Sequence, residues 1–111
     1  MMDLYQLTWK YFSAFERKDL DALKELYSST VSLMDWDVEC HGREKVLEAN
    51  RGLFDSVDDI KVDITRCTVD KLLLTATAEI VITLDKQEII VADIITYSQD
   101  GVIKNIRAYK G

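Results

Sequence analysis

From Ile60 to the end of the chain, apolar residues recur at almost every second position. Successive side chains of a β-strand point to opposite faces, so this period of two predicts strands with one buried face. Short polar stretches divide the pattern, and Asp100-Gly101 is typical of a hairpin turn. Turns this short join antiparallel neighbours. The expected strands are 60–69, 72–84, 89–98 and 102–109. The 72–84 run exceeds the usual strand length of about five or six residues, so we expect it to bend.

The first half of the chain has the period of helices instead. A first helix at about 4–17 has its apolar face at Leu4, Leu7, Tyr11 and Phe15. Asp19 is a candidate N-cap of a second helix, whose inner side carries Leu20, Leu23, Leu26 and Tyr27. A short strand is expected at 31–35, and a third helix at about 43–55 with a stripe of Val46, Ala49 or Asn50, and Leu53. The predicted order is two helices, a strand, a helix and four antiparallel strands.

Size and charge narrow the class of protein. A chain of 111 residues predicts one domain, 1–111, and 48% apolar with 31% charged residues is ordinary for a globular protein. The net charge of −6 argues against a nucleic-acid partner, because that affinity depends on Lys and Arg. No apolar run approaches the roughly 20 residues that cross a bilayer. We therefore expect no membrane partner and, without a signal-like N-terminus, a cytoplasmic location. The two cysteines are expected to be free thiols.

Three polar residues occupy positions that the periodicity directs toward the interior. Tyr11 shares the apolar stripe of the first helix, Asp35 follows Val31 and Leu33 at period two, and Asp93 lies mid-strand between apolar neighbours. A buried carboxyl needs strong partners or has a raised pKa, which is how proteins make acids and bases that work near neutral pH. The hypothesis is a pocket. If the sheet is covered on both faces, however, either carboxylate could point outward.

The order of elements and several short motifs resemble the nuclear transport factor 2-like superfamily, especially its ketosteroid isomerase and SnoaL-like branches. The motifs are Lys-Tyr-Phe at 10–12, Lys-Asp-Leu-Asp at 18–21, His-Gly-Arg-Glu at 41–44, the segment 93–101, and Arg-Ala-Tyr at 107–109. The resemblance spans nearly all of the chain. It implies an α+β fold, in which a curved antiparallel sheet forms a cone around three N-terminal helices and holds a small apolar molecule.

The resemblance also implies roles for particular residues. Asp35 matches a general base that removes a proton next to a carbonyl group. Tyr11 and a protonated Asp93 match the two hydrogen-bond donors to the resulting enolate. Ketosteroid isomerase is a standard example of pKa tuning, because it uses a neutral carboxylic acid in this way. Tyr27 matches a tyrosine that supports the first one. The expected substrate-binding residues are Tyr27, Trp36, Asn50 and Phe54. Asn50 stands where some isomerases have another tyrosine, and Trp36 where proline is usual.

Other readings of the same residues remain open. The protein could be a non-catalytic ligand-binding or dimerisation module, or a small hydrolase or cyclase in which carboxylates position water. Tyr11 could be a core aromatic and Asp35 a solvated strand end. Asp35, Asp37, Glu39 and His41 could be read as a metal site, but a single histidine is weak support, so we expect neither metal nor cofactor. A homodimer through the outer face of the sheet is expected, with Leu73 and Val81, or Ile90 and Ile94, exposed according to strand parity.

Overall fold

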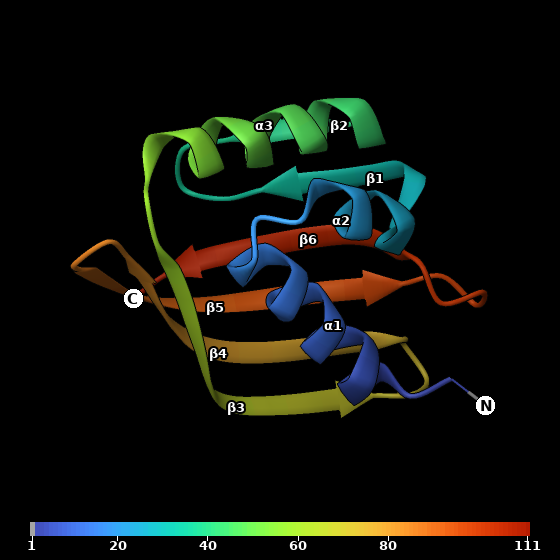
Figure 1. Ribbon diagram of the computed structural model, residues 1–111. Helices are drawn as coiled ribbons and strands as arrows, with labels where there is room; N and C mark the ends of the chain where they lie inside the picture. Colours follow the sequence, from blue (N-terminus) through green and yellow to red (C-terminus); the bar gives the residue numbers. More distant parts are fainter. Residues whose placement is uncertain (1) are drawn as a thin grey trace.

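The computed structural model describes residues 2–111 as three helices and one open six-stranded sheet (Figure 1). The elements in chain order are α1 (Leu4–Glu16), α2 (Leu20–Leu26), β1 (Tyr27–Met34), β2 (Glu39–His41), α3 (Arg43–Ser56), β3 (Ile60–Asp70), β4 (Thr75–Leu84), β5 (Gln87–Tyr97) and β6 (Ile103–Lys110). The strand order across the sheet is β2-β1-β6-β5-β4-β3. The expected α+β fold class is confirmed.

The last four strands form an antiparallel meander, as the alternation predicts. β4 pairs with β3 on one side and β5 on the other, and β5 pairs with β6. The boundary of β4 differs from the prediction, because residues 71–74 form a turn and leave Leu72 and Leu73 exposed. Asp70 explains this late start of β4: its Oδ1 atom accepts the backbone N–H groups of both leucines and holds them in the turn. Leu74 then has a φ of 52°, which no strand residue adopts.

The region around β1 differs most from the sequence prediction. Tyr27 begins β1 instead of ending α2, so the strand is longer than the expected 31–35. The short strand β2 was not anticipated; it pairs antiparallel with β1. β1 itself pairs parallel with β6, joining segments that are far apart in the sequence. No local pattern reports such a long-range pairing, since each strand's periodicity is the same whichever partner it has.

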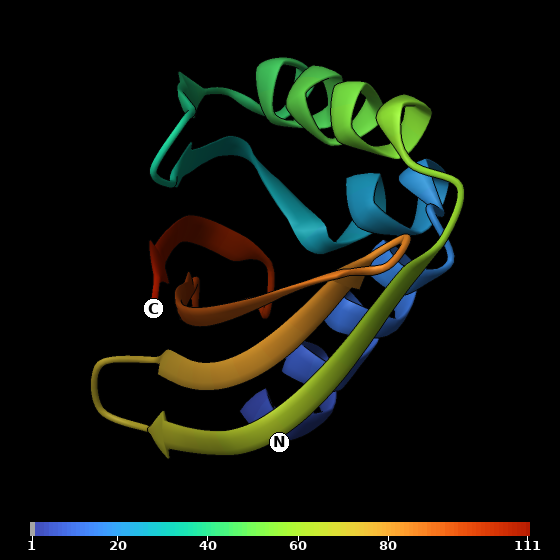
Figure 2. The same cartoon turned by 90° about the vertical axis from the view of Figure 1, so that its left-hand side faces the viewer.

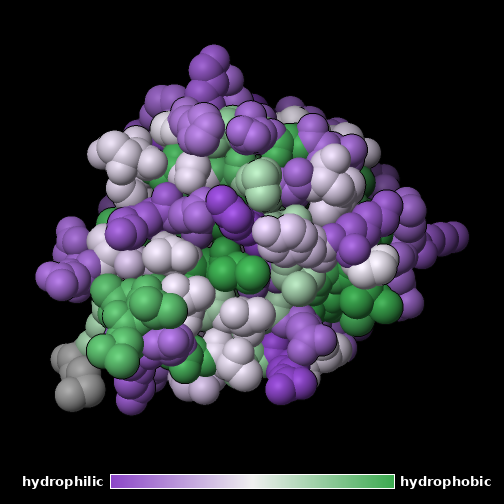
Figure 3. All heavy atoms as spheres, turned by 180° about the vertical axis from the view of Figure 1, so that it is seen from behind, coloured by the Kyte–Doolittle hydropathy of each residue, from purple (hydrophilic) through white to green (hydrophobic). Residues whose placement is uncertain are grey.

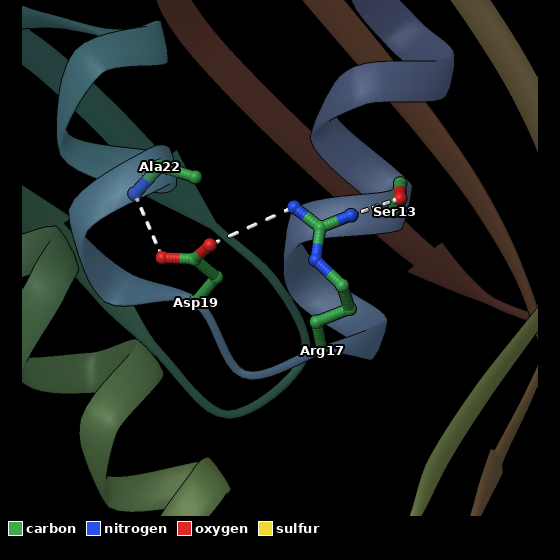
Figure 4. A network of polar contacts seen from close by, with 4 residues as sticks. All are labelled: Ser13, Arg17, Asp19 and Ala22. Atoms are coloured by element: carbon green, nitrogen blue, oxygen red, sulfur yellow. Dashed lines mark hydrogen bonds and ion pairs between the residues drawn. The ribbon is translucent and has the colours of Figure 1, made fainter.

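The junction of α1 and α2 is fixed by polar contacts (Figure 4). Asp19 is the N-cap of α2, as predicted, and its Oδ1 accepts the backbone N–H of Ala22 at 3.0 Å. Its other oxygen lies 3.6 Å from the guanidinium of Arg17, which also donates to the Ser13 hydroxyl. The cap satisfies a backbone donor that the first turn of a helix leaves free. These contacts hold α2 at the end of α1.

The sheet is strongly curved, and the helices lie on its concave side (Figure 2). α1 packs against β3 and β4, while α3 packs against β1 and β2. Register shifts between Ile64 and Arg66 and between Thr96 and Tyr97 are irregularities of the kind that increase strand bending. The buried core lies between the helices and this face. Within residues 2–111 no helix is long and apolar enough to cross a membrane.

The face of the sheet that points away from the helices is partly apolar. Figure 3 shows hydrophobic atoms near the centre of that side of the molecule, among polar ones. Val81 and Ile90 are cross-strand partners, so they share this face, and Ile90 is 63% exposed. Ile94 lies on the same face because it is four residues from Ile90. The sequence left open which apolar residues lie on the outer face of the sheet. In the structure they are Val81, Ile90 and Ile94, and Leu73 lies in the turn before β4.

Candidate functional site

A cavity of about 290 Å³ lies between the concave face of the sheet and the helices. Its walls are mainly apolar side chains from α1, α3 and all strands except β2. Tyr11, Asp35 and Asp93 all line it, so the structure brings together the three residues that the sequence singles out. They come from α1, the end of β1 and the middle of β5. The cavity is near the lower limit of the sizes usual for small-molecule sites.

Asp93 is the most unusual group in the cavity. Its neighbours across β4 and β6 are Ala78 and Ala108, whose small side chains leave room beside the carboxyl group. The residue is only 7% exposed, and no side-chain hydrogen bond to it is formed within residues 2–111. Burial, and secondarily the charge of Asp35, raise the pKa of Asp93 to about 7. Near neutral pH a large fraction of this carboxyl group is protonated and able to donate a hydrogen bond.

Tyr11 lies close to Asp93 and belongs to a small group of buried tyrosines. Burial raises the pKa of Tyr11 well above its ordinary value, with smaller contributions from Tyr27 and Asp93. The rings of Tyr11 and Tyr27 have centroids 6.3 Å apart. The Tyr27 hydroxyl donates to Oδ1 of Asn50 at 2.7 Å. Tyr11 is therefore a neutral hydroxyl group, held at one side by the supporting pair Tyr27 and Asn50.

Asp35 has a different setting, in a tight turn at the mouth of the cavity. Its Oδ1 atom accepts the backbone N–H groups of Asp37 at 2.8 Å and Val38 at 2.7 Å. Its own N–H group donates to the carbonyl oxygen of Val38. This is the short-range side-chain to backbone bonding by which Asp stabilises turns. Within the described chain, Oδ2 has no hydrogen-bond partner and remains available to a ligand.

The four expected substrate-binding residues divide into two groups. Trp36 and Asn50 line the cavity; Trp36 is 43% exposed, with the Lys110 ammonium 5.8 Å from the centre of its ring. Tyr27 and Phe54 lie behind the wall, which differs from the expectation of direct ligand contact. Phe54 packs edge-on against Phe15 with ring centroids 5.1 Å apart. Neither residue lines the cavity, so their effect on a ligand is indirect.

The structure adds residues that the sequence reading did not assign to the site. Asp37 lines the mouth next to Asp35, and its position at period two from Asp35 was a usable signal. Lys110 was missed because only the β1 and β6 pairing brings it to Trp36. His41 ends β2 with its side chain exposed and 4.0 Å from Glu39. Across residues 2–111 no group of three His, Cys, Asp or Glu side chains is arranged to hold a metal ion.

An open cone of curved sheet around helices, with carboxylates inside, defines the nuclear transport factor 2-like class of folds. The sequence matches the model of the SnoaL-like domain over residues 10–106. The chain belongs to this family. No curated protein matches the sequence.

Solved structures agree with the fold. A ketosteroid isomerase-like protein from Kribbella flavida DSM 17836 has a TM-score of 0.84 at 17% identity, covering 97% of this chain and 77% of that one. AusH from Aspergillus nidulans has a TM-score of 0.85 at 12% identity, covering 97% and 83%. An LEH-like epoxide hydrolase from M. tuberculosis has a TM-score of 0.79 at 14% identity, covering 97% and 82%. At these identities the likeness concerns the fold alone.

Proposed function

We propose that this protein catalyses proton transfer next to the carbonyl group of a small, neutral, apolar molecule. The observation that carries the proposal is the Asp93 carboxyl group, which is buried without a side-chain partner in a cavity that it shares with Asp35 and Tyr11. A neutral carboxylic acid beside a neutral phenol is a pair of donors for one oxygen atom. The Asp35 carboxyl group, which lines the same cavity, supplies the base.

The reaction follows from these positions. Oδ2 of Asp35 removes a proton from the carbon next to the carbonyl, and the C–H electron pair moves to form an enolate. The Tyr11 hydroxyl and the protonated Asp93 donate hydrogen bonds to the enolate oxygen. Asp35 then returns the proton to the same or a neighbouring carbon. No atom is gained or lost, so the product is the substrate or its isomer.

The charge of the cavity favours a neutral ligand. Among the lining residues within 2–111 there are three aspartates and no Lys, Arg or His. A carboxylate or phosphate would be repelled by Asp35 and Asp37 and would find no cation inside. An uncharged ketone would lose little by leaving water, because the rest of the wall is apolar. The proposed substrate class is therefore small neutral carbonyl compounds.

The test uses 2-indanone, a small neutral ketone with exchangeable protons next to its carbonyl. The protein should accelerate exchange of these protons in D₂O, followed by NMR, and Asp35→Asn should reduce the enzymatic rate by about a hundredfold or more. Asp37→Asn is the matched control, since it changes the neighbouring carboxylate at the mouth and should leave most of the rate. An exchange rate unchanged by Asp35→Asn would rule out this mechanism.

A second candidate function is ligand binding without catalysis. The observation that favours it is the turn at Asp35, where Oδ1 already accepts two backbone N–H groups and stabilises the turn. Such a carboxylate can be structural. In that case 2-indanone binds to the protein but its proton exchange is not accelerated, which the same NMR experiment detects.

We also propose that the protein is a homodimer that buries the outer face of the sheet. Ile90 with its neighbours Val81 and Ile94 forms the exposed apolar part of that face, and a second copy presents the same surface by twofold symmetry. Ile90→Lys should convert a dimer to a monomer in sedimentation experiments. Leu72→Lys, at a fully exposed turn, is the control and should remain dimeric. A monomeric wild-type protein would contradict the proposal.

A further inference from the structure

One buried polar side chain in the cavity has no part in the reaction described above. Asn50 lies on α3 between Val46 and Phe54, at the four-residue spacing of the inward stripe, and is 5% exposed. Asparagine is unfavourable in a helix interior and costly to bury without partners. Its presence there needs an explanation that packing alone does not give.

The two ends of the Asn50 amide are in different situations. Its Oδ1 atom accepts the Tyr27 hydroxyl, and Tyr27 is itself buried. Within residues 2–111 the Nδ2 group donates to no acceptor. Every fully enclosed side-chain nitrogen or oxygen of these residues has a partner, so the Nδ2 atom is not fully enclosed. Since Asn50 lines the cavity, the unpaired N–H₂ group is on the cavity side. Tyr27 thus fixes which end of the amide a ligand meets.

We propose that Asn50 is a specificity-determining residue, whose N–H₂ group donates a hydrogen bond to an acceptor oxygen of the bound ligand. This rests on the proposed function and refines its substrate class. The Asn50 amide keeps its bond to Tyr27 while its N–H₂ group donates to a ligand oxygen. A ligand acceptor at Asn50 therefore gains a bond without breaking one. The site selects ligands that carry an acceptor oxygen over hydrocarbons of the same shape.

The test compares the binding of 2-indanone, 2-indanol and indane, which share one ring skeleton and differ in the polar group. The wild-type protein should bind the ketone about tenfold or more tightly than indane. Asn50→Leu should reduce this preference, mainly by weakening ketone binding, and leave the part that Tyr11 and Asp93 supply as donors to the same oxygen. Leu53→Ala, on the same helix and cavity wall, is the control: it should weaken the ketone and the hydrocarbon equally.

A second variant keeps the test decisive if Asn50→Leu does not fold. Asn50→Asp retains an oxygen for the Tyr27 hydroxyl and replaces the cavity-side donor by an acceptor, so at pH 8 it should favour 2-indanol over 2-indanone. The proposal is overturned if the wild-type protein binds 2-indanone no more tightly than indane, or if neither Asn50 variant alters the relative binding of the three compounds. These binding results are independent of proton exchange, so Asn50 can fail as a selector while Asp35 still acts as a base.

Discussion

The two ends of the cavity differ in how they hold their polar groups. At the deep end, Tyr11, Asn50 and Asp93 project from the middle of α1, α3 and β5, and each is at most 7% exposed. At the mouth, Asp35, Trp36 and Asp37 belong to one short turn after β1 and are partly or largely exposed. Regular elements packed on all sides fix the deep groups. The mouth depends on a few hydrogen bonds of a single turn.

This difference gives the same residue type two different properties. Asp93 is surrounded by apolar side chains, and burial raises its pKa to about 7. Asp35 is partly exposed, and its Oδ1 atom accepts two backbone N–H groups. The charge at the mouth in turn acts on the deep carboxyl as the second cause of its raised pKa. One fold can therefore present an acid and a base side by side, because the two ends of the cavity differ in exposure.

The largest expected effect is the pH dependence of stability caused by Asp93. A carboxyl group whose pKa is near 3.8 in the unfolded chain and about 7 in the folded protein binds its proton more tightly when folded. The stabilisation is complete below pH 4, declines as the pH rises through 7, and is lost above it. At about 1.4 kcal/mol per pKa unit, the contribution of Asp93 to the free energy of unfolding changes by about 4 kcal/mol.

Asp93→Asn removes this titration while keeping the shape of the side chain. Urea unfolding between pH 5 and pH 8, followed by circular dichroism, should show a steep loss of stability in the wild-type protein and a shallower one in the variant. At pH 8 the variant should be the more stable of the two. Asp63→Asn, an exposed strand carboxylate, is the control and should follow the wild-type curve. Parallel curves for the wild-type protein and Asp93→Asn would place Asp93 in a solvated setting and remove the contrast between the two ends.

A smaller effect is expected from the Tyr11 hydroxyl. Tyr11→Phe removes one donor to the enolate oxygen, which should slow 2-indanone exchange by roughly 2–3 kcal/mol of transition-state stabilisation and leave ground-state binding less affected. Tyr97→Phe is a matched control. Tyr97 is also buried, but its hydroxyl contacts Thr8 at 2.8 Å and it does not line the cavity.

The two tyrosine variants should therefore differ in which property they change, the melting temperature or the exchange rate. Tyr97→Phe should lower the melting temperature without changing the exchange rate, because it leaves the buried Thr8 hydroxyl with one partner fewer. Tyr11→Phe should slow exchange with a smaller loss of stability. Equal exchange rates in both variants would show that Tyr11 is a core aromatic and not a donor to the ligand.

The sequence predicts the deep end of the cavity better than the mouth. Tyr11 and Asp93 lie in long regular elements, where periodicity alone places a side chain on the buried face. Asn50 was recognisable as an alternative to Ala49 on the stripe of the third helix. The four late strands were predictable for the same reason, apart from the turn after Asp70, which extends to residue 74 and delays the start of β4.

The mouth could not be predicted in the same way, because it depends on contacts between distant segments. The pairing of β1 with β6 brings Lys110 to Trp36, across most of the length of the chain. The strand β2 exists only because the 35–38 turn folds the chain back on β1. Tyr27 was placed on a helix because its apolar neighbours fit the helical period as well as they fit a strand start. Local patterns do not contain this information, and tertiary contacts decide it.

The smallest expected effect tests whether the mouth is as loosely held as its geometry indicates. The Lys110 ammonium lies 5.8 Å from the Trp36 ring, and a cation–π contact at an exposed site contributes about 0.5–1 kcal/mol. Lys110→Met should therefore increase the dissociation rate of 2-indanone by only about two- to fivefold, since the ring loses one neighbour but stays in its turn. Lys104→Met changes an exposed lysine of the same strand and should have no effect. Trp36 fluorescence can report the rate in a Trp9→Phe background, which leaves a single tryptophan. A change as large as that caused by Tyr11→Phe would mean that Trp36 is fixed as firmly as the deep residues, and the contrast between the two ends would then be one of exposure only.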